Sequence, residues 1–246
     1  MIDTSTFWND SQNLDTWPVL TDTPHDALIF KTGGSTSQGK RVVYTHDEWQ
    51  QMVRTFGQGL AAQLSAGDRV ANLFFAGDLY AGFLFIHASL AHVGVPVAEF
   101  PFTGEVDPTT LAQAIGEHRI NVLAGVPAQL LRFGAWLGEQ RIVLPQVTTV
   151  LYGGESLFAA QLPILERVFP NARIASVGYA CVDAGLVGAS TRDCGLGEHR
   201  AFDGHTHVEI VDEQTGEVID ECDRAGPAGN QQSDAPAHAD AALSGR

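Results

Sequence analysis

Residues 120–154, INVLAGVPAQLLRFGAWLGEQRIVLPQVTTVLYGG, contain a predicted strand, helix and second strand in succession. The first seven residues are almost all apolar, and Pro127 then opens a segment of helix length that runs to about Leu137. A second apolar run, VTTVLYGG, begins at Val147. Apolar strands separated by a helix-length segment indicate a βαβ unit, in which the two strands are parallel and the sheet is covered on both faces.

The same alternation extends along the chain on both sides of this stretch. We expect further strands at 27–30, 41–44, 68–75, 95–100 and 172–179, and further helices at 45–64, 78–94, 107–118 and 157–169. These elements predict an α/β protein with a mostly parallel, doubly wound sheet. Past Leu186 the pattern changes: in THVEIVDEQTGEVID (206–220) the apolar residues recur at every second position. This alternation predicts a β-hairpin and hence a small antiparallel annex at the C-terminal side.

The two ends differ from the core in composition. Residues 1–26 are mostly polar, contain Trp and Pro at intervals and show neither a helical nor a strand periodicity of apolar residues. We therefore expect an irregular arm that wraps a surface formed by later parts of the chain. Residues 27–223 form the expected core domain. Residues 224–246 are rich in Ala, Gly, Pro, Asp and Ser and almost free of large apolar groups, which predicts a disordered tail because little surface can be buried.

Composition limits the classes of partner. The 246 residues are 44% hydrophobic, enough for a buried core, and 29 acidic against 14 basic residues give a formal charge of -15. No basic run is present, so nucleic acid and anionic membrane are not expected partners. No transmembrane-length apolar stretch or signal peptide is evident, and three cysteines lack CxxC spacing, so we expect a cytoplasmic protein with reduced thiols.

The segment KTGGSTSQGK, residues 31–40, holds three glycines, four hydroxyl side chains and both lysines of the chain. From Gly34 it matches the first seven positions of the P-loop pattern GxxxxGK[ST], but Arg41 stands where a hydroxyl is needed for magnesium. A P-loop must also lead directly into a helix whose N-terminus faces the phosphates. Here RVVY is strand-like, and the next helix begins only at a capping box of Thr45 and Glu48. We therefore do not expect a P-loop.

A hairpin-like loop between two strands is the second interpretation. Gly33 and Gly34 would let backbone N–H groups turn inward. Four hydroxyl side chains would donate to phosphate oxygens: Thr32, Ser35, Thr36 and Ser37. The third interpretation is a Gly- and Ser-rich turn that holds no ligand.

Two later segments favour phosphate binding. Gly153-Gly154-Glu155-Ser156 ends one predicted strand, and Tyr179-Ala180-Cys181-Val182-Asp183 ends the next. Taken alone, the first could be an ordinary strand-to-helix turn. In this order and at these distances from TGGSTSQGK, the segments resemble the adenylate-forming superfamily of acyl- and aryl-CoA ligases, whose loop is typically written SSGTTGKP.

The resemblance implies a role for each of these segments. It places ATP or AMP against Thr32, Gly33, Gly34, Ser35, Thr36, Gly153, Gly154, Glu155 and Ser156. The ring of Tyr179 would stack on adenine and Asp183 would help to bind magnesium, since a flat apolar face suits a base and an oxygen ligand suits a hard cation.

Within the superfamily the chain is most similar to the phenylacetate-CoA ligase branch, and there to the adenylation proteins of phenazine-antibiotic biosynthesis. The segments that carry this resemblance are DLYAGFLFIHASLAHVGVPVAEF (78–100), INVLAGVPAQLLRF (120–133) and FDGHTHVEIVDEQTGEVID (202–220). The first looks like the helix and strand that bear the aryl pocket, which implies substrate contacts for Tyr80, Phe85 and Gly178. Without the resemblance, such aromatic side chains are usually core residues.

The chain departs from the family pattern at several positions. Val182 stands where the family has Thr or Ser and cannot donate to a phosphate, and Asp183 replaces a Glu and reaches less far. The lysine position of the loop is shifted, so Lys40 is left unassigned. After TGEVID the family continues with a ribose-binding Asp and a C-terminal lid domain with a Lys, whereas this chain continues ECDRAGPAG, which leads us to expect a truncated or frame-shifted chain.

A zinc site is a further possibility near CGLGEHRAFDGHTH. The phenylacetate branch has a comparable C-x4-GLH segment that is a metal site in some members, and sulfur and imidazole ligands suit zinc. Cys194 and His199 are the first candidates, with His205 and His207 nearby. Alternating histidines on one strand face are equally common as exposed polar residues.

Two functions stay open. The resemblance implies ATP- and magnesium-dependent activation of an aromatic carboxylic acid as its acyl-adenylate, transfer of the acyl group to a thiol or amine, and often a homodimer. The alternative is a catalytically incomplete chain that binds a nucleotide or an aryl acid as a non-catalytic binding or scaffold protein. Val182 and the missing lid segments favour the alternative for this chain.

Overall fold

The computed structural model describes residues 7–8, 10–20, 24–33, 39–202, 204, 206–207, 209, 212, 215 and 218. A five-stranded sheet with the order β4-β3-β5-β6-β7 forms its centre, and every neighbouring pair is parallel. The strands are β3 (Arg69–Asn72), β4 (Ala98–Pro101), β5 (Val122–Gly125), β6 (Thr149–Tyr152) and β7 (Arg173–Ser176). This architecture confirms the predicted α/β fold with a mostly parallel sheet.

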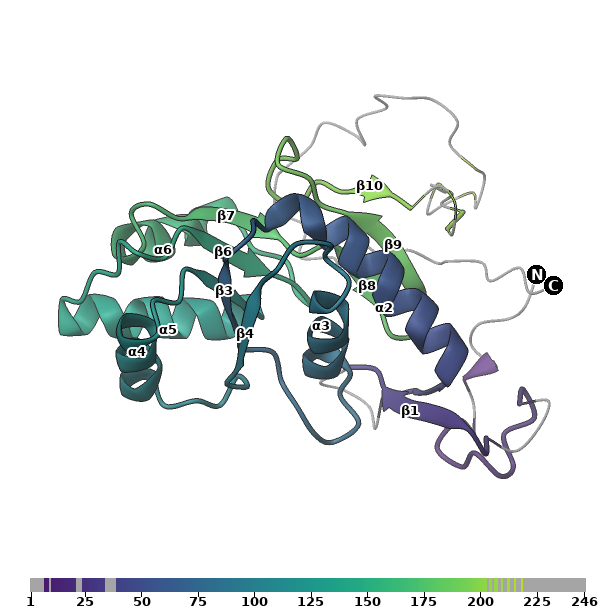
Figure 1. The fold of residues 1–246 in the computed structure, drawn as a ribbon. Helices are drawn as coiled ribbons and strands as arrows, with labels where there is room; N and C mark the ends of the chain where they lie inside the picture. Colours follow the sequence, from purple (N-terminus) through teal and green to yellow (C-terminus); the bar gives the residue numbers. More distant parts are fainter. Residues whose placement is uncertain are drawn as a thin grey trace.

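Helices cover both faces of the sheet because successive strand residues point to opposite sides. One face packs against α4 (Pro108–Glu117), α5 (Pro127–Gln140) and α6 (Leu162–Val168), and its core contains Ala71 and Leu123 from the strands. The other face packs against α2 (His46–Leu60) and α3 (Gly82–Leu90), with Val70 and Leu151 from the strands. Figure 1 shows these two groups of helices on opposite sides of the sheet.

The N-terminal part of the core is a two-stranded antiparallel ribbon that leads into α2. β1 (Ala27–Lys31) pairs with β2 (Arg41–Thr45), so residues 32–40 connect two strands, as expected for a hairpin-like loop. Thr45 and Glu48 form the predicted capping box, in which each side chain bonds the other's backbone N–H. Helix α2 is followed by a short 3₁₀ helix, Ala61–Gln63.

Two helices start later than the sequence pattern predicts. α3 begins at Gly82 rather than at 78, because Asp78 and Leu79 have φ values of 48° and 61° in a turn that closes at Tyr80. α6 begins at Leu162, after a 3₁₀ helix at Ala159–Gln161. Pro163 lies in its first turn and has no N–H to continue a helix that began at 157.

A second, antiparallel sheet follows β7 and confirms the expected annex. Its order is β10-β9-β8, from β8 (Tyr179–Cys181), β9 (Gly185–Ala189) and β10 (Arg200–Ala201). It is built from residues that precede the predicted hairpin at 206–220, most of which lies outside the described residues, as does the predicted tail at 224–246.

The described part of the N-terminal arm contacts the C-terminal end of residues 31–40, called the glycine loop below. Trp17 is buried, and its ring packs with those of Phe7 and Trp8. Ser11 is also buried, and its Oγ accepts a 3.3 Å hydrogen bond from the backbone N–H of Arg41. The contacts hold residues 7–8 and 10–17 against the start of β2.

Candidate functional site

A cavity of about 630 Å³ lies beyond the carboxyl ends of the central strands, between α2, α3 and the β8–β9 hairpin. Residues from seven separate segments line it: Lys31, Thr32, Gly33, Lys40, Trp49, Met52, Phe56, Phe74, Tyr80, Ala81, Gly82, Phe85, Ile86, Gly154, Val177, Gly178, Ala180, Cys181, Val182 and Asp183. Ligands of open α/β sheets bind at this edge. The volume falls in the range of small-molecule sites.

The cavity brings together seven of the predicted site residues. They come from each segment of the predicted nucleotide and aryl-acid sites: Thr32, Gly33, Tyr80, Phe85, Gly154, Gly178 and Asp183. The predicted loop residues Gly34, Ser35 and Thr36 lie outside the described residues, so their placement stays a prediction.

Four described residues of the predicted nucleotide site are not among the residues that line the cavity: Gly153, Glu155, Ser156 and Tyr179. Gly153 is buried, and a Cβ there would lie 2.4 Å from Cγ2 of Val177, so its role is close packing. Glu155 and Ser156 are exposed. Tyr179 is half-buried with its ring 5.7 Å from that of His199, and burial raises the pKa of its hydroxyl.

The charged side chains of the described cavity lining are two lysines and one carboxylate. The Nζ of Lys40 lies 3.2 Å from Oδ2 of Asp183 and 5.0 Å from the ring centre of Trp8. The Nζ of Lys31 pairs with Asp78 at the exposed rim. The sequence prediction left Lys40 unassigned and omitted Lys31, although the chain has no other lysine.

The Asp183 carboxylate suits a magnesium ion that arrives with phosphate. Asp183 is the only acidic residue among the described residues that line the cavity. Across the described part of the chain, no three His, Cys, Asp or Glu side chains gather into a metal cage. Magnesium is usually held by one or two carboxylates together with substrate phosphates, so one carboxylate beside two lysines fits that ion when it is bound to a nucleotide.

Much of the remaining lining is aromatic and apolar. Trp49, Met52 and Phe56 project from one face of α2, and Phe85 comes from α3. The ring of Phe85 lies 4.6 Å from that of Phe56 and 5.9 Å from that of Trp49. The sequence analysis missed the α2 residues, although their spacing of three, four and seven along the helix could have marked them as one face.

Tyr80 lies beside two glycines of the cavity lining. The Tyr80 hydroxyl is 3.7 Å from the position that a Cβ on Gly154 would take, and a Cβ on Gly33 would lie 3.8 Å from its ring. Burial, and then the charge of Glu155, raise the pKa of Tyr80. Gly178 has φ of 132°, and a Cβ there would come within 2.8 Å of the Phe56 ring, so glycine is required.

The turn that carries Asp183 is fixed from outside the cavity. The hydroxyl of Tyr44 donates a 2.7 Å hydrogen bond to the carbonyl of Val182. Burial first, and then the charge of Asp183, raise the pKa of Tyr44 to about 12. The Val182 side chain packs against the cluster of Phe30, Trp49 and Val53.

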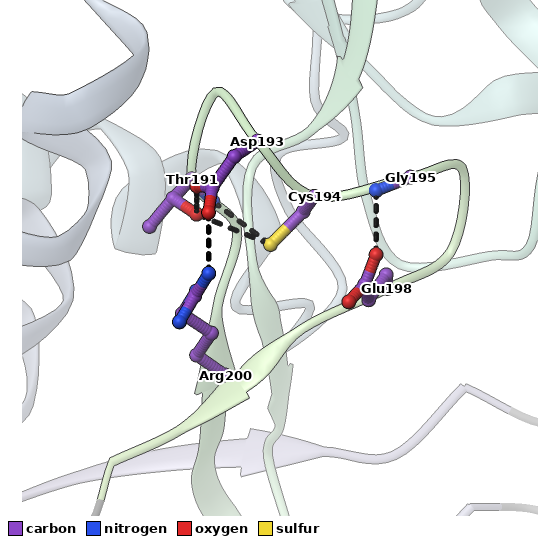
Figure 2. A network of polar contacts seen from close by, with 6 residues as sticks. All are labelled: Thr191, Asp193, Cys194, Gly195, Glu198 and Arg200. Atoms are coloured by element: carbon purple, nitrogen blue, oxygen red, sulfur yellow. Dashed lines mark hydrogen bonds and ion pairs between the residues drawn. The ribbon is translucent and has the colours of Figure 1, made fainter.

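The two zinc candidates have protein partners in this structure. The thiol of Cys194 contacts the backbone N–H and the hydroxyl of Thr191, at 3.4 and 3.2 Å, in a network with Asp193 and Arg200 (Figure 2). His199 instead places Nε2 2.8 Å from Oγ of Ser176, and burial lowers its pKa. His205 lies outside the described residues. Zinc binding here stays a prediction.

Comparison with known proteins was made at the level of family, sequence and fold. The family model described as "AMP-binding enzyme" matches residues 3–227. No curated protein sequence matches the chain. No helix among the residues that the structure describes is long and apolar enough to cross a membrane.

Solved structures resemble the fold at low sequence identity. A 2-hydroxyisobutyryl-CoA ligase in complex with 2-HIB-AMP and CoA has a TM-score of 0.64 and 14% identity, covering 78% of this chain and 41% of its own. The N-terminal domain of FACL13 from Mycobacterium tuberculosis has a TM-score of 0.57 and 22% identity. That match covers 82% of this chain and 50% of the FACL13 chain. A luciferase-like enzyme from the Zophobas morio mealworm has a TM-score of 0.53 and 18% identity. That match covers 82% of this chain and 47% of the mealworm chain. The chain thus spans half or less of these three chains.

Proposed function

Because the chain belongs to the AMP-binding enzyme family, we propose that it binds ATP and an aromatic carboxylic acid in the 630 Å³ cavity and activates the acid as its acyl-adenylate. The neighbour that binds 2-HIB-AMP and CoA supports this reaction class. The proposal includes transfer of the acyl group to a thiol or an amine. The sequence resemblance to the phenylacetate-CoA ligase branch supports an aryl acid and a role in phenazine-type biosynthesis.

The observation that carries the proposal is the polarity of the cavity. The lining combines three charged groups, Lys31, Lys40 and Asp183, with the rings of Trp49 and Phe85. A polyanion with its metal suits the charged groups, and a flat apolar acid suits the rings. With both ligands in one cavity, the carboxylate of the acid would face the α-phosphate.

The residues of this chain would contribute mainly by positioning and charge neutralisation. A carboxylate oxygen of the acid attacks the α-phosphorus of ATP, the bond from phosphorus to the α,β-bridging oxygen breaks, and pyrophosphate leaves with that electron pair. Lys31 and Lys40 would neutralise phosphate charge, and Tyr80 would separate the two ligand sites. Magnesium, held by Asp183 and the phosphates, would supply further neutralisation.

The second candidate function is binding without turnover. Val182 offers no hydroxyl to a phosphate, and Lys40 and Asp183 pair with each other, so a ligand must separate them. A protein with these features could hold a nucleotide or an aryl acid as a scaffold.

ATP–pyrophosphate exchange with a panel of benzoic, phenylacetic and phenazine carboxylic acids separates the two functions. We expect acid-dependent exchange in the wild type and its loss in Tyr80→Ala, which removes the group between the two ligand sites. ATP binding without exchange for any acid would support the non-catalytic function. Absence of exchange together with absence of binding of both ATP and every acid of the panel would refute both functions.

A further inference from the structure

Tyr44 connects two segments of the candidate site that lie far apart in the sequence. It belongs to β2, which directly follows the glycine loop, and its hydroxyl bonds the carbonyl of Val182, 138 residues away, at 2.7 Å. Val182 is the first residue of the short turn between β8 and β9. Asp183 is the next residue of the same turn.

Both partners of this hydrogen bond are held by packing. The ring of Tyr44 lies 6.3 Å from those of Phe30 and of Trp49. The side chain of Val182 packs against the same cluster. Tyr44 therefore has a fixed ring position from which its hydroxyl can restrain the turn.

The restraint matters because Asp183 faces the cavity from a turn of three residues. Its side chain is 28% exposed, and Oδ2 lies 3.2 Å from Nζ of Lys40. Lys40 is itself four residues before Tyr44, so the same ribbon supplies the lysine and the hydroxyl. A rotation of the Val182–Asp183 peptide would break the Tyr44 hydrogen bond and move the carboxylate away from Lys40.

We propose that Tyr44 is a positioning residue for Asp183: its hydroxyl fixes the β8–β9 turn so that the carboxylate points into the cavity beside Lys40. The proposal rests on the proposed function, since it assigns Asp183 to the metal of a bound nucleotide. Val182 contributes its carbonyl to this arrangement, a role that any residue type could supply. The hydroxyl of Tyr44 has no substitute in that role among the described residues.

Tyr44→Phe removes the hydroxyl and keeps the ring, so it isolates the hydrogen bond from the packing. Tyr152→Phe is the matched control. The Tyr152 hydroxyl also bonds main chain, accepting from the N–H of Gly197 at 3.0 Å, but Tyr152 does not line the cavity. Hydrogen–deuterium exchange of the peptide over residues 179–189, without ligand, measures the turn directly. We expect faster exchange in Tyr44→Phe alone, and unchanged exchange there would overturn the proposal.

The second measurement is the affinity for ATP with Mg²⁺ compared with ATP in EDTA. We expect Tyr44→Phe to keep the affinity for ATP in EDTA. The factor by which Mg²⁺ raises the affinity for ATP should be about three- to tenfold smaller than in wild type, the size of one hydrogen bond. Tyr152→Phe should keep the full gain. Asp183→Asn should lose it, and Tyr44→Phe added to Asp183→Asn should then have no further effect.

The outcomes distinguish this inference from the proposed function. A wild type that binds no ATP, or gains nothing from Mg²⁺, would refute the proposed function and the metal role of Asp183 together. A wild type that gains affinity from Mg²⁺ while Tyr44→Phe gains equally would overturn only the role of Tyr44.

Discussion

The thiol of Cys181 lines the cavity wall beside Asp183, and its reactivity should report on that wall. Burial, and then the charge of Asp183, raise the pKa of Cys181, so its thiolate fraction at pH 8 is below that of a free thiol. At pH 8 we expect iodoacetamide to react more slowly with Cys181 than with the thiol of glutathione. Because the pKa of Cys181 is raised, its reaction rate should continue to rise at pH values above the ordinary thiol pKa. Mass spectrometry of the alkylated peptide measures this rate.

A ligand in the cavity provides the control for Cys181. Mg-ATP with an aryl acid should protect the thiol, and Cys181→Ser should remove the corresponding modified peptide. A Cys181 that reacts at pH 8 as fast as glutathione, with or without ligand, would contradict the placement of this residue in the cavity wall.

Single residues of the site were predictable where a local motif contained them. Gly33, Gly154 and Asp183 lie in segments whose residue types and order point to a nucleotide site, and all three line the cavity. The pairing of Lys40 with Asp183 was not predictable, because it joins residues 143 positions apart. Glu155 belongs to a recognisable segment, yet it is exposed outside the cavity lining, since a motif does not specify where a side chain points.

At the scale of elements, the start of α2 should depend on Thr45. The Thr45 hydroxyl accepts from the N–H of Glu48, and the Glu48 carboxylate accepts from the N–H of Thr45. We expect Thr45→Ala to lower the free energy of unfolding by about 1 kcal/mol, because the first turn of α2 loses its cap. Urea denaturation measures the loss. Thr45→Ser keeps an oxygen at the cap and should recover most of the stability; equal losses in both variants would contradict the capping role.

The contact of α2 with α3 depends on the absence of a side chain at Gly57. A Cβ there would lie 2.3 Å from the carbonyl oxygen of Ser89 and 2.8 Å from Cβ of His92. We expect Gly57→Ala to destabilise the protein by about 2 kcal/mol, because the helices must separate. Gly116→Ala in α4 is the control: no atom lies within 4 Å of its Cβ, and it should stabilise the protein by about 0.5 kcal/mol. A Gly57→Ala variant as stable as wild type in urea would refute the close contact.

Elements were predictable where short-range chemistry decides them. The strands and α2 follow from apolar runs and from the Thr45–Glu48 pair. The start of α3 was not predictable, because the pattern from 78 is uniformly apolar and the left-handed backbone at Asp78 and Leu79 depends on the turn around Tyr80. The packing of Gly57 on α3 was equally hidden, since the sequence does not say which helix lies opposite.

At the scale of the whole molecule, the two faces of the parallel sheet differ in whether their core residues also line the cavity. The face covered by α4, α5 and α6 packs around Leu123, and none of the described residues of its core lines the cavity. The face covered by α2 and α3 packs around Leu151, and its core includes Phe56, Phe74 and Ile86, which also line the cavity. The sequence predicted a doubly covered sheet, but it could not predict which face supports the site, because that depends on the direction of each crossover.

This division predicts different effects for two similar truncations. Leu123→Ala and Leu151→Ala each remove a fully buried side chain from a central strand, and each should cost about 2 to 5 kcal/mol in urea unfolding. Below the unfolding transition, Leu151→Ala should also weaken aryl-acid binding, because the cavity it leaves lets Phe56 and Phe74 relax away from the ligand. Leu123→Ala should bind the acid as wild type does, since its neighbours lie on the other face. Equal weakening in both variants, measured by calorimetric titration, would show that the site depends on overall stability rather than on the α2–α3 face.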